Sequence, residues 1–310
     1  MGMAAALAAF FGVPLGGSLF ALEINSRFGV EYFEHVVESI FCGEVALAVF
    51  RAASGLPIEP IWNITELKLE NATPMMVCVG AAIGLLGAGV ASLFAIFHFK
   101  VVDIFGSLDL LDNKKAVWRA LLGAIFIVGI GMFIPQTLFW GESEFQQIAS
   151  LAPTSELEHI YPPQGLIGFE MQTMGACLLV ALFKMIAISF TVAGGYRGGF
   201  IFPFFAAGAA FGRALCFVFP SLPPQLACLC FAAGINVAIT RTSLATTLIL
   251  AYLGKLFSIA LRFLRTNIFS AGEPCAIPAI LAASLVSLFA TSYMVRRLKI
   301  LLYIYPNKIY

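Results

Sequence analysis

The most distinctive chemical feature of the sequence is a glycine-rich stretch between two apolar runs, GGYRGGFIFP at residues 194–203. Pro203 suits the first turn of a helix, where the N–H that proline lacks would have no intrahelical acceptor. The backbone amides of Gly199, Phe200 and Ile201 would then be unpaired donors at a helix N-terminus, which carries about half a positive charge and binds anions. The stretch therefore predicts an anion site. The alternative is an ordinary helix–helix turn in which glycine permits close packing.

Two basic residues accompany this stretch. Arg197 lies inside it, and Lys184 lies in the apolar run at residues 173–192. Either cation could raise the local concentration of anions, because a charge at membrane depth is often functional. Arg197 could equally pair with a loop glutamate, and Lys184 could be paired or could extend its amine toward the surface. Both interpretations remain open for each residue.

The composition places these residues in a membrane protein. Of 310 residues only 35 are charged, 18 Lys or Arg and 17 Asp or Glu, which is 11% against about 25% in soluble domains. Hydrophobic residues make up 60% of the chain, and the mean hydropathy is +0.94. These values exclude a disordered chain and a basic nucleic-acid binder, and they argue against a soluble enzyme. Phosphate-binding loops, catalytic nucleophile motifs and metal-ligand spacings are absent from the sequence, so we expect no enzyme activity, no metal and no cofactor.

Charge-poor runs long enough for helices in a bilayer recur along the chain. Three runs are interrupted: the first by Pro14 and nearby glycines, the sixth by Gly198, Gly199 and Pro203, and the seventh by residues 240–242. Helices broken at membrane depth survive only where protein or a wet cavity satisfies the backbone, and such breaks mark the sites of transporters and channels. We therefore expect an all-α, multi-pass integral membrane protein with broken and half-spanning helices. The runs cover about residues 2–22, 36–50, 74–99, 116–139, 173–192, 199–220, 225–253 and 276–295.

The loops predict an orientation in the membrane. Residues 100–119 contain three lysines and one arginine, the C-terminal segment is also basic, and residues 141–170 contain five glutamates and no lysine or arginine. The positive-inside rule places both basic segments in the cytosol and residues 141–170 outside or in a lumen. Two Asn-x-Thr sequons in the 52–73 loop agree with an outer position for that loop.

Three segments resemble one family of membrane proteins. GGFIFPFFAAGAAFG resembles the G-x-F-x-P signature of the CLC family of voltage-gated chloride channels and chloride/proton exchangers. PLGGSLFALE, at residues 14–23, resembles the family's P-L/I-A/G-G-x-L-F-x-x-E stretch, and residues 231–252 are similar to its late pair of half-helices around a polar break. The order and spacing of the three segments also fit, and the likeness spans about residues 1–300.

The resemblance implies a pathway for chloride or a similar monovalent anion inside each subunit. The backbone amides at Phe200 and Ile201 would line the central chloride site. Gly198, Gly199 and Pro203 would shape the loop that carries these amides.

The resemblance also implies a homodimer in the lipid bilayer, with the helices at residues 16–50 and 240–260 at the subunit interface. A tyrosine near the last helix would contact the anion. Tyr293, Tyr303 and Tyr305 all lie near that region, and Tyr303 is the candidate chosen among them. The CLC fold is an inverted repeat, so the expected domains are the remainder of the first repeat at 1–52, an extracellular or lumenal loop at 53–73, the second repeat at 74–295 and the start of a cytosolic tail at 296–310.

Two features depart from the family pattern. The motifs G-S-G-I-P and G-K/R-E-G-P, of which the second carries the gating glutamate, occur nowhere in the chain, so we expect it to be the later part of a longer protein. Many exchangers end the P-L-G-G stretch with two consecutive glutamates and use the latter to relay protons, whereas this chain reads Glu23-Ile24. Isoleucine holds no proton, which favours a passive chloride channel. The alternatives are a chloride/proton antiporter and a truncated membrane remnant that transports nothing.

Overall fold

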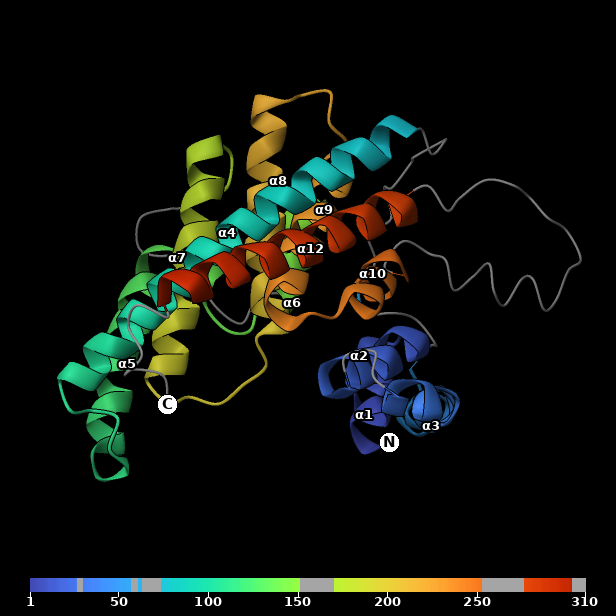
Figure 1. Ribbon diagram of the computed structural model, residues 1–310, viewed down its shortest axis with the longest axis horizontal. Helices are drawn as coiled ribbons and strands as arrows, with labels where there is room; N and C mark the ends of the chain where they lie inside the picture. Colours follow the sequence, from blue (N-terminus) through green and yellow to red (C-terminus); the bar gives the residue numbers. More distant parts are fainter. Residues whose placement is uncertain (27–29, 57–60, 63–73, 151–169, 253–275, 303–310) are drawn as a thin grey trace, which may run out of the picture.

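Every regular element in the described part of the chain is a helix. The two longest, α4 (Pro74–Ser107) and α12 (Ala276–Leu302), run side by side through the molecule (Figure 1). Gly80 and Gly84 make this contact possible, because a Cβ on either residue would collide with the backbone of α12 at Ala279 or Ala283. The computed structural model describes residues 1–26, 30–56, 61–62, 74–150, 170–252 and 276–302.

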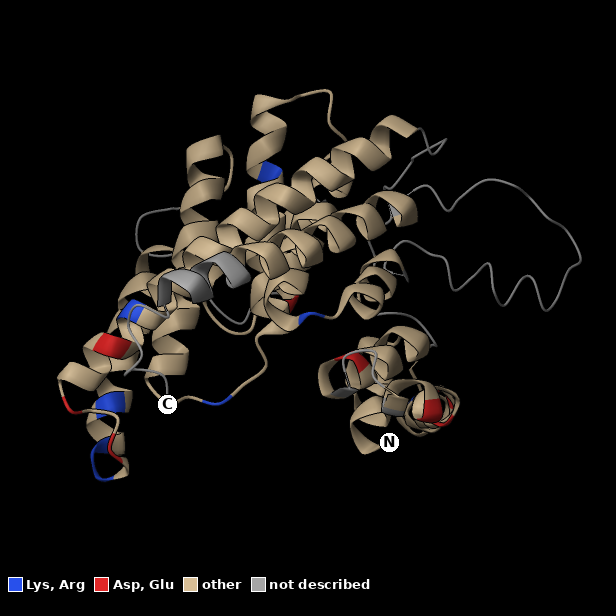
Figure 2. Ribbon diagram, viewed as in Figure 1, with Lys and Arg blue, Asp and Glu red and all other residues tan. Residues whose placement is uncertain are grey.

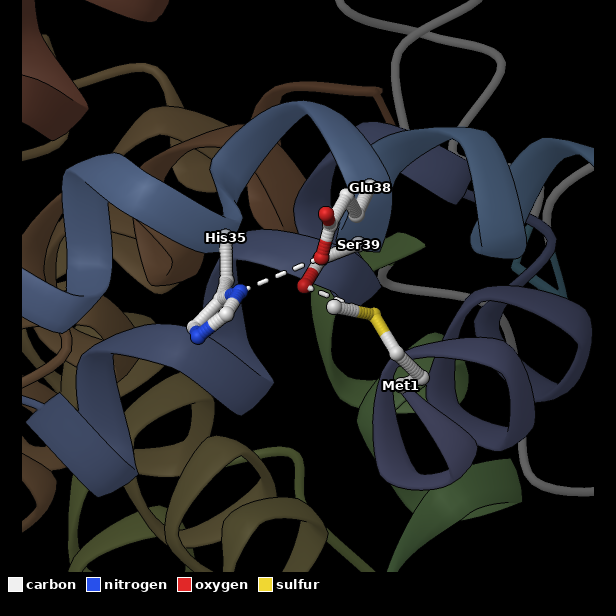
Figure 3. Close-up of polar contacts among 4 residues, drawn as sticks. All are labelled: Met1, His35, Glu38 and Ser39. Atoms are coloured by element: carbon white, nitrogen blue, oxygen red, sulfur yellow. Dashed lines mark hydrogen bonds and ion pairs between the residues drawn. The ribbon is translucent and has the colours of Figure 1, made fainter.

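The first three helices form a group at one end of the molecule (Figure 1): α1 (Gly2–Phe11), α2 (Pro14–Ser26) and α3 (Val30–Ser54). The break expected near Pro14 is confirmed, since α1 ends at Gly12 with a φ of 66° and Pro14 begins α2. Polar contacts on α3 are few. Figure 3 shows His35 bonded to Glu38 at 3.1 Å along the exposed face of α3, and Ser39 reaching the sulfur of Met1 at 3.5 Å. Ser39 thus connects α3 to the residue before α1, and the described residues hold no cluster of metal ligands.

The middle of the chain builds the part of the molecule around the glycine-rich stretch. Helix α8 packs against α7, α9 and α6, and α5 packs against α7. Small residues let α8 sit deep in this group, and its segment 206–210 is fully buried. The elements are η1 (Asn113–Lys115), α5 (Ala116–Phe133), η2 (Pro135–Thr137), α6 (Glu142–Ser150), α7 (Met174–Ala193), α8 (Ile201–Val218) and α9 (Pro224–Thr240).

A second break separates α9 from α10 (Ser243–Tyr252), as the sequence predicts. Arg241 ends α9 in the left-handed region, with a φ of 67°. Its guanidinium donates to the carbonyl of Leu288 at 3.2 Å and to the hydroxyl of Ser292 at 2.6 Å, so the break is tied to α12. Beside it, Thr242 and Thr246 join hydroxyls at 3.0 Å inside the protein.

Five helical segments in the described ranges are long and apolar enough to cross a bilayer. Figure 2 shows the long helices tan along most of their length, with acidic and basic segments gathered where α4 passes into α5 and acidic segments on the N-terminal group. The expectation of an integral, multi-pass, all-α membrane protein is confirmed. The segments are Pro74–Ser107, Asn113–Phe133, Met174–Ala193, Ile201–Val218 and Ile277–Met294.

Candidate functional site

The glycine-rich stretch leads directly into the N-terminus of α8. Phe200 is the N-cap residue, Ile201 is the first helical residue, and Pro203 lies in the first turn, where the sequence predicts it. The carbonyl of Phe200 accepts from the amide of Phe204 at 3.1 Å. The amides of Gly199, Phe200 and Ile201 have no hydrogen-bond acceptor among the described residues. Free amides at a helix N-terminus are suited to an anion.

The bend before this helix end depends on a glycine to which the sequence assigned no role. Gly195 has a φ of 84°, a conformation that residues with a side chain rarely adopt. Gly198 and Gly199, which we expected to shape the loop, have no positive φ, and a Cβ on either would meet no heavy atom within 4 Å. Backbone conformation therefore requires glycine at Gly195, whereas Gly198 and Gly199 leave open space beside the candidate amides.

An aromatic cluster holds the first turn of α8 in place. Phe202 stacks on Phe11 with ring centroids 5.2 Å apart, and Trp62 meets Phe202 edge-on at the same distance. The indole N–H of Trp62 donates to the carbonyl of Glu142 at 2.8 Å. Sequence reasoning missed Trp62, which lies between Ile61 and Asn63 in the 53–73 loop, where no motif marks it.

Lys184 is buried, with 2% of its surface exposed, and its ammonium points at the segment after η2. The Nζ donates to the carbonyls of Thr137, Leu138 and Phe139, each at 3.0 Å. An ammonium group has three N–H bonds, so all of them are used. Glu144 provides an opposite charge nearby. This geometry supports the paired interpretation of Lys184 and leaves it no N–H for a passing anion.

The remaining candidate residues lie in different places. Arg197 is exposed on the loop and forms no ion pair with the described residues, so its expected pairing with a loop glutamate is absent there. Tyr303 lies outside the described residues. Residues 63–73 and 303–310 also lie outside, together with the sequons and the end of the expected cytosolic tail.

A polar contact also joins the N-terminal group to the rest of the molecule. Glu23, at the end of the PLGGSLFALE segment, is fully buried in α2. Its Oε1 accepts from the amides of Leu244 and Ala245 at 3.1 and 3.2 Å, in the first turn of α10. Glu23 therefore caps a helix that begins more than 200 residues later. The adjacent Ile24 carries no titratable group.

Comparison with known proteins identifies the arrangement. A family model described as voltage gated chloride channel matches residues 1–272. The uncharacterised protein MJ0305 of Methanocaldococcus jannaschii is 28% identical over 249 residues, covering 79% of this chain and 53% of that protein. YfeO of Escherichia coli O6:H1, whose name describes an ion-transport protein, is 24% identical, covering 77% of this chain and 51% of its own length. The chain thus spans about half the length of these relatives.

Two solved structures share the fold. A CLC-type fluoride/proton antiporter superposes with a TM-score of 0.67 at 19% identity, over 94% of this chain and 62% of that one. A slow cyanobacterial Cl⁻/H⁺ antiporter gives a TM-score of 0.62 at 16% identity, over 92% and 58%. These similarities confirm the predicted CLC-type fold.

Proposed function

This chain belongs to the voltage gated chloride channel family, and we propose that it forms the later part of a pathway for chloride or a similar monovalent anion. The observation that carries the proposal is the start of α8, where the amides of Gly199, Phe200 and Ile201 lack acceptors among the described residues. Amide dipoles attract an anion without trapping it, as conduction requires. Pro203 lies in the first turn beside this site, Gly198 leaves open space there, and Tyr303 is proposed as a further contact.

Chloride flux through the full-length protein in liposomes tests the proposal. The informative variant is Gly199→Val, because a Cβ at Gly199 would meet no heavy atom within 4 Å and the fold should tolerate it. The new side chain would stand between an anion and the amides, so flux should fall. Gly89→Val, in equally open space on α4, is the matched control. Equal flux in the two variants and the unchanged protein would remove the site assignment.

Transport by passive conduction is our first choice, and chloride/proton antiport is the second candidate. Ile24 favours the channel because it cannot relay a proton, whereas both superposed structures are of antiporters and favour exchange. The reversal potential under a pH gradient separates the two. We expect it to follow the chloride gradient alone, and a shift with pH would establish antiport. Absence of any flux from the full-length protein would favour the non-transporting remnant.

We further propose that the protein is a homodimer that uses the exposed face of α3. Phe33, Val37 and Phe41 follow one another at helical spacing and are all exposed apolar side chains. Residues near a twofold axis meet their own copies. In a background without Cys42 and Cys78, a bifunctional thiol reagent should therefore link Val37→Cys into dimers. It should not link Leu93→Cys, which is equally exposed on α4. Equal yields at the two positions would contradict this interface.

We also propose the division into repeats that the sequence predicts. Residues 1–52 would complete the first repeat, and residues 74–295 would form the second. The break between α1 and α2 and the break between α9 and α10 support this division, because each unit then contains one broken pair of helices.

A further inference from the structure

The crossing of α5 and α7 is unusually close at its glycines. A Cβ built on Gly123 would lie 3.0 Å from the carbonyl oxygen of Phe190 and 3.1 Å from the Cα of Gly194. The backbone of α5 is therefore in contact with the end of α7, where the loop to α8 begins. One helical turn before Gly123 stands Arg119, which this contact places against the loop.

The guanidinium of Arg119 lies on the left-handed glycine of that loop. A Cβ on Gly195 would come within 2.8 Å of both Nε and Cζ of Arg119. The next residue of the loop also contacts α5, because the hydroxyl of Tyr196 donates to the carbonyl of Ala120 at 3.0 Å. The loop is therefore attached to α5 at the position of the arginine.

Arg119 has no counter-charge in the described structure. Its Nε is buried without an acceptor, and the guanidinium forms no ion pair with the described residues. An alternative role for Arg119 would be to donate hydrogen bonds to free carbonyls at the end of α7. The carbonyls of Thr191 and Val192 already accept from Tyr196 and Gly195, at 3.1 and 3.0 Å. At the same end of the molecule, the carboxylate of Asp109 is bonded to Lys115.

The glycine that Arg119 contacts, Gly195, lies a short way along the chain from the candidate anion site. Phe200 follows Gly195 by five positions, and a chain segment of that length spans at most about 18 Å. Arg197, exposed and also unpaired among the described residues, lies between them. At 0.01 M salt the Debye length is about 30 Å, which exceeds this span, so such charges raise the local concentration of anions at the amides. A guanidinium suits this role because it is always charged and weakly hydrated.

We propose that Arg119, together with Arg197, forms a recruiting site for small inorganic anions at the junction of α5 and the loop, from which the amides of α8 are loaded. The inference rests on the proposed function, since it assigns the entry of the same pathway. It assigns Arg119 a role at the entry, which neither the sequence motifs nor the family match specifies. The recruited ligand is the permeating anion itself, and chloride is the probe.

The test measures chloride flux in liposomes as a function of chloride concentration. Arg119→Gln should lower flux about threefold at roughly 10 mM chloride and leave it nearly unchanged at roughly 300 mM, where salt screens the charge. Arg119→Lys should retain most of the flux. Lys114→Gln is the control, because it removes the same charge from an exposed position in η1.

Each other outcome overturns a distinct statement. If Arg119→Gln and Lys114→Gln give equal flux at low chloride, the recruiting site is contradicted. It is also contradicted if Arg119→Gln loses the same fraction of flux at every chloride concentration, because that pattern indicates a damaged fold. If Arg119→Gln does not fold, the exposed Arg197→Gln must show the same dependence on chloride at smaller size, and its absence overturns the inference. No flux in the unchanged protein would instead reject the proposed function.

Discussion

The carboxylate of Glu23 accepts a hydrogen bond from the backbone amide of Leu244 at 3.1 Å, across 221 residues of chain. The same oxygen accepts from Ala245 at 3.2 Å, and the side chain is fully buried. A carboxylate at a helix N-terminus satisfies free donors and opposes the positive end of the helix dipole. Glu23 therefore connects the N-terminal group of helices to α10, at the second break in the fold.

Replacement of Glu23 should show whether its acceptor oxygen or its negative charge holds α10. Glu23→Ala leaves two buried amides without an acceptor, and we expect a loss of about 1–3 kcal/mol in stability. Glu23→Gln keeps a carbonyl oxygen of the same shape and should retain most of the stability. Thermal melting in detergent measures both variants, with the exposed Asp103→Ala as control. A Gln variant as unstable as the Ala variant would show that the negative charge, and not the acceptor, holds α10.

Lys184 should stabilise the segment between η2 and α6. Lys184→Met removes the donors of three carbonyls at Thr137, Leu138 and Phe139 while keeping an apolar stem. We expect hydrogen exchange of the amides at residues 137–145 to quicken by about tenfold, since local opening should become easier. Lys100→Met, on the exposed end of α4, should leave these rates unchanged. Unaltered exchange in the Lys184 variant would show that its hydrogen bonds do not hold the segment.

Gly195 should tolerate no side chain, in contrast to Gly198 three residues later. Gly195→Ala places a Cβ in the left-handed region, which costs about 1–2 kcal/mol, and brings that Cβ against Arg119. Gly198→Ala meets open space at an ordinary φ. Thermal melting should therefore fall for Gly195→Ala only. Equal melting of the two variants would indicate that the loop relaxes freely and that its contact with α5 is weak.

Several features of the fold are readable from local sequence. Pro14 marks the first break, because proline cannot continue the helix before it, and Pro203 marks the first turn of α8. The polar triplet at residues 240–242 marks the second break. The low charge content predicts the membrane environment. Each of these features depends on residues adjacent in the chain, which is why a single sequence reveals them.

The features that the sequence did not reveal are contacts between distant segments. Lys184 could be recognised as a buried charge, but its acceptors are carbonyls 45–47 residues away that have no side-chain signature. Glu23 was recognised as part of a motif, but its partner amides begin another helix. The glycine-rich stretch contains four glycines, and the sequence does not distinguish among them. The positive φ of Gly195, which only the structure shows, distinguishes it from the other three.

The most direct test of the anion site removes one backbone N–H and leaves every side chain in place. Incorporation of the α-hydroxy analogue of isoleucine at Ile201 replaces its amide by an ester. The same substitution with the alanine analogue at Ala209, buried within α8, is the control. Because a hydrogen bond to a charged ligand contributes about 1.5–3 kcal/mol, chloride affinity should fall about tenfold or more for the ester at Ile201 and stay unchanged for the control. An unchanged chloride affinity with the ester at Ile201 would contradict the account.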